Sequence, residues 1–178
     1  GTMGRHGEAG LGSLYRLDAN GSVTQILSGA DISNGIVWSP DKRFMYWTDT
    51  LKGVIYAFDY DDVSGRVSNR RVAFKLDPAD GLPDGMTIDA EGMLWVACWE
   101  GGKVIRVDPE AGTKRAEVKL PASRVTSCAF GGADLDRLYI TTARMALSDA
   151  ELTKQPDAGS LFVCEPGVRG IPAVAYAG

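Results

Sequence analysis

Apolar and polar residues alternate with a period of two along most of the chain, which is the pattern of short, half-buried β-strands. Three strand signals recur in a fixed order, and the loops between them vary in length. The first signal covers 35–38, 85–88 and 127–130, the second covers 45–48, 94–97 and 138–141, and the third covers 53–59, 102–108 and 159–165. An extra copy of the third signal stands early, at 12–18. The pattern therefore predicts an all-β protein built from an internal repeat.

A fourth strand signal ends each copy of the repeat, at 23–27, 70–74 and 116–120. The repeat is roughly 40 to 50 residues long, which is the length of one four-stranded propeller blade. The chain carries strands for about three and a half blades, and a propeller closes with at least about four. We therefore expect 1–178 to form a single partial β-propeller domain. It would belong to a larger ring, or complete one by self-association through its open blade edges.

The alternation breaks at 148–152, inside a long loop that runs from 144 to 155. Ser148 and Glu151 have the spacing of a capping box, in which each residue satisfies a backbone donor of the other. The segment predicts a single helical turn in an otherwise helix-poor chain.

A polar turn precedes the first strand in two copies of the repeat. One copy has Asn34-Gly35 there and the other has Pro83-Asp84-Gly85, and each is a turn signal when taken singly. Their equivalence matters because the first strands of propeller blades line a central channel, so equivalent positions converge on its axis. The Asn carbonyl and the Asp carboxylate are hard oxygen donors that suit calcium, magnesium or manganese. Two ligands do not close a site, so water or residues outside the chain would supply the rest.

Composition narrows the choice of partners. The chain of 178 residues has a formal net charge of −4 and an isoelectric point near 5.0. Nucleic acids and anionic membranes recruit basic patches, and the basic residues here are scattered, so we expect neither as a partner. No apolar run predicts a membrane span. The three cysteines lie far apart without metal-site spacing, and we interpret them as small apolar residues of a reducing, cytoplasmic compartment.

Several catalytic arrangements are missing from the sequence. His6, the only histidine, lies in a Gly-rich loop without a Ser or Cys partner pattern, so we expect no catalytic triad. The loop at 59–65 looks briefly like a calcium loop but lacks an oxygen ligand and a glycine that such a loop needs, so it predicts a plain turn. Trp99 follows a strand and is a candidate to line the mouth of a ligand site, whereas Trp38, Trp47 and Trp95 are expected in packing.

The chain resembles the senescence-marker-protein/gluconolactonase/regucalcin family over nearly its whole length. The most specific stretches are 32–35, 58–61, 82–89, 91–97, 102–106 and 155–159. The resemblance implies a six-bladed propeller with one divalent metal ion, calcium, zinc, magnesium or manganese, at its channel. It implies that Asn34 and Asp84 are two of three protein ligands, and the third, a Glu near the family's N-terminus, is not in this sequence. Gly1-Thr2-Met3 resembles a strand end of the family, so we expect the N-terminal blades to be absent.

The resemblance also implies a substrate and a reaction, the hydrolysis of sugar lactones. Met3 matches a residue near the substrate, and Glu8 lies in the loop that holds a substrate-side Glu, although that loop is shortened here. The Arg and Asn that usually hold the sugar lie upstream in the family and are also absent.

The expected mechanism is metal-dependent. The ion would polarise the lactone carbonyl, Asn34 would hold it as a neutral donor, and Asp84 would also take a proton from the attacking water. We expect the parent protein to be a lactonase and this chain alone to be weak or inactive. Two alternatives stay open, namely a non-catalytic calcium-binding regulatory propeller and a protein-interaction propeller in which both residues are plain turns.

Overall fold

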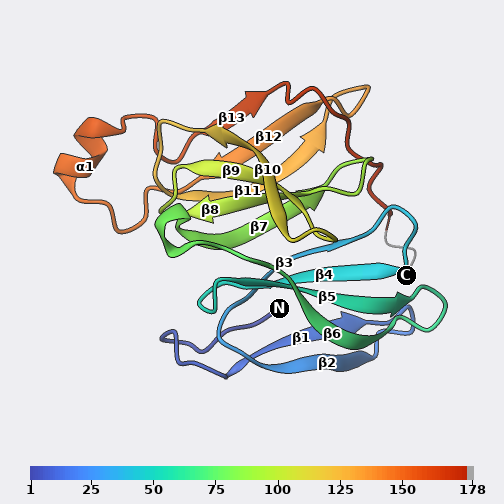
Figure 1. Cartoon of the computed structure of the whole chain (residues 1–178). Helices are drawn as coiled ribbons and strands as arrows, with labels where there is room; N and C mark the ends of the chain where they lie inside the picture. The colour runs from blue at the N-terminus through green and yellow to red at the C-terminus, as the bar shows by residue number, and fades with distance from the viewer. Residues whose placement is uncertain (176–178) are drawn as a thin grey trace.

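The computed structural model describes residues 1–175 and is all-β, as the alternation predicts (Figure 1). The strands of these residues form four antiparallel sheets. The first sheet holds β1 (Gly12–Leu17) and β2 (Val23–Ala30), and the second holds β3 (Ser33–Trp38), β4 (Phe44–Asp49), β5 (Val54–Asp61) and β6 (Arg66–Lys75). The third holds β7 (Leu82–Ile88), β8 (Leu94–Trp99), β9 (Lys103–Asp108) and β10 (Thr113–Lys119), and the fourth holds β11 (Val125–Gly131), β12 (Arg137–Thr142) and β13 (Leu161–Cys164).

Each predicted copy of the repeat forms one sheet, and the strands of each sheet are paired in chain order. The second and third sheets have four strands each, whereas the described residues give the first sheet two strands and the fourth sheet three. In Figure 1 the sheets follow one another from the bottom of the view to the top. The closure of a ring and the number of its blades stay predictions.

The hydrophobic core consists of three clusters, one between each pair of neighbouring sheets. Strand β4 shows how the period of two builds them, because Met45 and Trp47 pack toward the first sheet and Tyr46 packs toward the third. Strand β8 does the same, with Leu94 in one cluster and Trp95 in the next. Side chains on both faces of these central strands are therefore buried, and each such aliphatic side chain contributes about 1.5–3 kcal/mol.

The first strands of three sheets, β3, β7 and β11, lie next to one another. Two glycines allow this approach. A Cβ atom at Gly35 would lie 2.7 Å from the carbonyl oxygen of Asp84, and one at Gly85 would lie 2.9 Å from that of Thr126. No side chain fits at those distances, so the strands can pack this closely only where glycine follows the polar residue.

Asn34 and Asp84 do not lie in turns, and this part of the prediction was wrong. Both lie inside strands, at β-bulges where β3 and β7 each carry one residue more than the partner strand. The register shifts fall between Ser33 and Ile36 in β3 and between Pro83 and Met86 in β7. A bulge changes the direction of a side chain locally, and Asn-Gly and Asp-Gly suit a bulge as well as a turn.

The predicted helical turn is confirmed as α1 (Asp149–Lys154), with Ser148 as its N-cap and both hydrogen bonds of the capping box in place. A short 3-10 helix, η1 (Pro78–Asp80), precedes β7 and was not predicted. Trp38 was expected in packing but is 38% exposed, because it stands at the end of β3 and only edges against Tyr60.

Candidate metal site

The side chains of Asn34 and Asp84 meet across the contact between β3 and β7. The Nδ2 group of Asn34 donates a hydrogen bond to Oδ1 of Asp84. The same group also donates to the hydroxyl of Thr50, 3.1 Å away, directly after β4. The two polar residues that the repeat placed at equivalent positions are thus in direct contact, although 50 positions separate them in sequence.

Thr50 is the member of this group that the sequence did not reveal. It follows β4, the strand that pairs with β3, and the pairing of Ser33 with Asp49 brings it beside Asn34. A hydroxyl can accept from an amide nitrogen or donate to an amide oxygen, so Thr50 can orient the Asn34 amide in either sense. Only the register of β3 on β4 would have shown that Thr50 lies beside Asn34.

The carboxylate of Asp84 is half-buried and has a neutral partner. Burial raises its pKa above the ordinary value for an aspartate, while the hydrogen bonds from Asn34 and from the backbone of Gly85 lower it. Within residues 1–175 no ion pair involves this carboxylate, whereas Asp80 nearby in the chain pairs with Lys103 at 2.5 Å. A half-buried carboxylate without a cationic partner carries a charge that the fold does not balance, and a bound cation would balance it.

These residues fit part of a site for a divalent cation. A carboxylate and a carboxamide supply two oxygen donors of the kind that calcium, magnesium and manganese prefer. No group of three or more His, Cys, Asp or Glu residues in the described part of the chain could hold a metal ion. The pair therefore needs further ligands from water or from outside these residues, and the Glu that the family resemblance implies stays a prediction.

Met3 and Glu8 have different surroundings in the fold. Met3 forms an isolated bridge with Ile32, two positions before Asn34, and is 57% exposed. Glu8 accepts a hydrogen bond from the backbone of His6 within its own loop, and this bond lowers the pKa of its carboxyl. Met3 thus lies beside the residue that precedes β3, and among residues 1–175 the hydrogen bond found for the Glu8 side chain is within its own loop.

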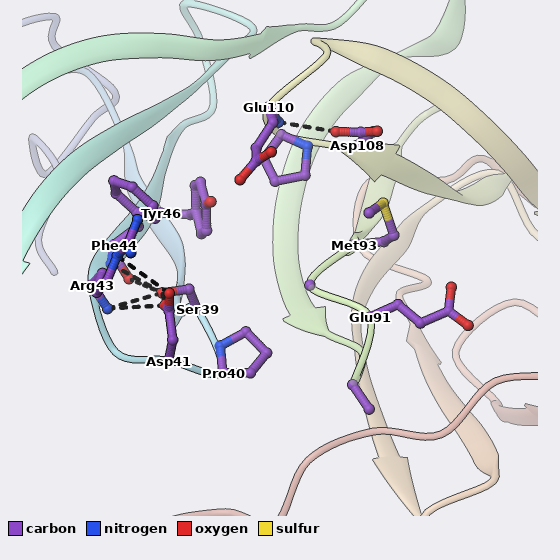
Figure 2. Close-up of a pocket in the computed structure, with 13 residues that line it drawn as sticks. Ser39, Pro40, Asp41, Arg43, Phe44, Tyr46, Glu91, Met93, Asp108 and Glu110 are labelled. Carbon is purple, nitrogen blue, oxygen red and sulfur yellow. Dashed lines mark hydrogen bonds and ion pairs between the residues drawn. The ribbon is translucent and has the colours of Figure 1, made fainter.

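A hollow of about 300 Å³ opens at the opposite end of the second and third sheets (Figure 2). Two of its carboxylates already have protein partners. Asp41 accepts from the Ser39 hydroxyl at 2.6 Å, and Asp108 accepts from Arg115 at 2.7 Å. These carboxylates fasten the loops that carry them, so the pair at the start of β3 and β7 remains the candidate metal site.

The fold and the paired donors define an all-β protein of repeated antiparallel sheets with a candidate cation site where two first strands meet. The model of the family described as SMP-30/Gluconolactonase/LRE-like region matches residues 1–144. The chain belongs to this family. This confirms the family that the sequence motifs indicate.

Individual proteins and solved structures that are similar to this chain belong to the same group of regucalcins and gluconolactonases. Regucalcin of Oryctolagus cuniculus is 48% identical over 168 residues, which are 94% of this chain and 56% of that protein. A solved structure described as a calcium-binding protein, regucalcin, from Agrobacterium tumefaciens has a TM-score of 0.89 at 35% identity and covers 95% of this chain and 57% of its own. A gluconolactonase from Xanthomonas campestris has a TM-score of 0.62 at 33% identity, over 72% of this chain and 41% of its own. The chain thus spans little more than half the length of the regucalcins.

Two further features bear on the environment of the chain. None of the helices formed by residues 1–175 is long and apolar enough to cross a membrane. The three cysteines are free, with Cys98 and Cys128 buried as the sequence predicts, and burial raises the pKa of the Cys98 thiol to about 12. The cytoplasmic location and the self-association through blade edges stay predictions.

Proposed function

We propose that this chain is about three and a half blades of a six-bladed propeller that binds one divalent metal ion and hydrolyses sugar lactones. The observation that carries the proposal is the contact between Asn34 and Asp84 from equivalent bulges of neighbouring first strands. Membership of a family that includes gluconolactonase supports the reaction class. The activity belongs to the whole protein, and we expect the 178-residue chain alone to be weak or inactive.

The incomplete end sheets support a larger ring. Strand β13 is at the edge of the fourth sheet, and two of its apolar side chains, Leu161 and Val163, are 63% and 57% exposed. An exposed, apolar edge strand normally pairs with another strand. A fourth strand from residues outside 1–175 would pair with the free edge of β13 and complete the blade, and a further sheet packed on this face would cover the two side chains.

The proposed chemistry divides between the residues of the pair. A divalent ion bound there would act as a Lewis acid on the lactone carbonyl. Asn34 contributes a neutral oxygen donor, held by Thr50, so the site gains no second negative charge. Asp84 accepts the proton of the water that attacks the acyl carbon and returns it to the ring oxygen, which leaves as a hydroxyl when the acyl C–O bond breaks. Met3 and Glu8 are proposed on the substrate side.

A calcium-binding role without catalysis is the second candidate, because the Agrobacterium relative is described as calcium-binding. The two proposals share the metal pair and differ in turnover. A panel of aldonolactones, assayed on the complete protein with calcium, zinc, magnesium or manganese, separates them. Metal binding without hydrolysis of any lactone would support the second candidate.

The deciding experiment is Asp84→Ala in the complete protein, with binding measured by calorimetry and hydrolysis by proton release. We expect both metal affinity and lactone hydrolysis to be lost. Asp41→Ala, in the opposite hollow, is the matched control and should keep both. If Asp84→Ala retains metal affinity and turnover, the proposed function is wrong, and a protein-interaction propeller becomes the better explanation.

A further inference from the structure

The hollow between the second and third sheets, at the end away from the metal pair, contains a polar group that the fold leaves unused. Tyr46 lines this hollow from β4 and is buried, with 5% of its surface exposed. In Figure 2 its side chain points into the space that the hollow encloses. Its hydroxyl takes part in no hydrogen bond among residues 1–175, whereas the hydroxyl of Ser39 in the same hollow donates to Asp41 at 2.6 Å. A buried phenol normally has a partner, so a ligand in the hollow would satisfy this one.

The Tyr46 hydroxyl stays protonated at neutral pH and faces a negative charge. Burial raises the pKa of Tyr46 to about 12, the negative charge of Glu110 adds to the increase, and the positive charge of Arg71 reduces it. Glu110 is the charged group that acts most strongly on this hydroxyl, and Coulomb interactions weaken with distance, so its carboxylate lies close by. A protonated phenol can donate one hydrogen bond and also accept one, so it can bind a donor that Glu110 attracts.

Carboxylates outnumber the basic groups around the hollow. Glu110 has no ion pair within the described part of the chain. The other three carboxylates of the lining each pair with an arginine, namely Asp41 with Arg43 at 3.3 Å, Asp108 with Arg115 at 2.7 Å and Glu91 with Arg106 at 2.6 Å. Arg106 also pairs with the buried Asp89, and Arg71 pairs with Asp59 at 2.8 Å. The excess charge is therefore negative even when every partner is counted, which favours a cationic ligand.

The cation that fits these groups is organic rather than a metal ion. The described residues contain no group of three or more His, Cys, Asp or Glu that could hold a metal ion. An ammonium group can donate to the Glu110 carboxylate and to the oxygen of Tyr46. Its carbon chain can contact the apolar surface of Phe44, Met93 and Pro109, which also line the hollow. The volume of about 300 Å³ is at the lower limit of small-molecule sites, so the ligand is small.

We propose that this hollow binds a primary aliphatic amine in its ammonium form, with the nitrogen between the Glu110 carboxylate and the Tyr46 hydroxyl. Tyr46 lies on β4 of the second sheet, and Glu110 lies in the turn between β9 and β10 of the third. The bound ammonium therefore joins the two sheets at the end away from the metal pair. The ligand class follows from the unpaired carboxylate, the unused phenol and the apolar lining, and it does not depend on the proposed function.

The test is calorimetry on the complete protein with n-butylammonium, n-butanol and butyrate as probes, in the presence of EDTA. We expect n-butylammonium to bind at least about tenfold more tightly than the alcohol, because a hydrogen bond between charged groups adds that much, and butyrate not to bind. Potassium chloride should weaken the binding of the ammonium ion. N-acetyl-lysinamide carries the same group on a side chain, so tighter binding of this probe would identify a lysine side chain as the source, and tighter binding of n-butylammonium a free amine.

Two substitutions and one control localise the binding. Glu110→Gln should weaken n-butylammonium about tenfold and Tyr46→Phe about fivefold. Tyr46→Phe should not lower the melting temperature of the free protein, because the hydroxyl that it removes has no partner among residues 1–175. Glu165→Gln, which removes the same charge as Glu110→Gln from a side chain that is 79% exposed outside the hollow, should change nothing. Equal losses for the two Glu→Gln variants, or equal affinity for n-butanol, would overturn the proposal.

The metal site and the hollow can fail independently. In an Asp84→Asn background with EDTA, n-butylammonium should still bind, because Glu110 and Tyr46 are unchanged. If binding is lost in that background, the amine sits on the metal pair and the proposal for the hollow is wrong. If binding persists there and the complete protein hydrolyses no lactone, the proposal for the hollow holds and the proposed function fails.

Discussion

Strand β7 has an aspartate at each end, and the two have opposite environments. Asp89, directly after the strand, is fully buried and accepts from Arg106 at 2.8 Å and from the Trp95 indole at 2.9 Å. It also accepts from two backbone amides of its own turn. Asp84, near the start of the strand, is half-buried and faces the neutral amide of Asn34. Asp89 is complete within the fold, whereas Asp84 has no ion pair with a cationic side chain of residues 1–175.

The different environments of the two aspartates indicate that Asp89 has a structural role and that Asp84 is a candidate functional residue. A buried charge is tolerated when it is paired and hydrogen-bonded on all sides, as Asp89 is. Asp80, in η1 just before β7, shows that the Asp84 end of the strand is not short of cations, since it pairs with Lys103 at 2.5 Å and Lys114 at 3.2 Å. Basic side chains are therefore present near this end of β7, but those of residues 1–175 form no ion pair with Asp84.

The largest expected effect is that of Asp89→Asn on stability. The substitution leaves the Arg106 guanidinium, whose side chain is 17% exposed, without its buried partner. We expect the free energy of unfolding to fall by about 3 kcal/mol, measured by urea denaturation, because breaking a buried pair strands a charge. Glu91→Gln removes the outer, 64% exposed partner of Arg106 and should cost less than about 1 kcal/mol. Equal losses for the two would contradict a structural role for Asp89.

Gly35→Ala tests the close approach that creates the Asp84 environment. The new Cβ would lie 2.7 Å from the Asp84 carbonyl oxygen, which is backbone and cannot move aside alone. We expect a loss of about 1–3 kcal/mol of stability together with a weaker metal response in thermal unfolding. An unchanged metal response after a clear loss of stability would show that the pair does not depend on the spacing of β3 and β7.

The alternation of apolar residues sufficed to predict the strands, because each sheet buries residues on a period of two against its neighbours. It also placed Asn34 and Asp84 at equivalent positions. It did not distinguish a turn from a bulge, since the same Asn-Gly and Asp-Gly pairs suit both and only the register on the partner strand decides. The contact of Thr50 with Asn34 depends on segments that are distant in sequence, which no local pattern encodes.

Asp80→Asn should have a smaller effect that depends on pH. The hydrogen bond from Lys103 lowers the pKa of Asp80 in the folded protein, with a further contribution from Lys114. A lowered pKa stabilises the fold above the unfolded value of about 3.9, and this stability is lost as the pH falls through the folded value. We expect Asp80→Asn to cost on the order of 1 kcal/mol at pH 7 and nothing at a pH below the folded pKa. A difference from wild type that does not change with pH would refute the ion pair as its cause.

Asp84→Asn should have the smallest effect on stability, and this makes it the direct counterpart of Asp89→Asn. Burial raises the Asp84 pKa, so its negative charge opposes folding at neutral pH, and an amide of the same shape removes that cost while still accepting from Asn34. We expect the free energy of unfolding to stay the same or rise by less than about 1 kcal/mol. The increase in melting temperature caused by calcium, zinc, magnesium or manganese should disappear, because one oxygen donor and the only negative charge of the pair are gone. A loss of stability as large as that of Asp89→Asn, with the metal response intact, would mean that both aspartates of β7 are structural.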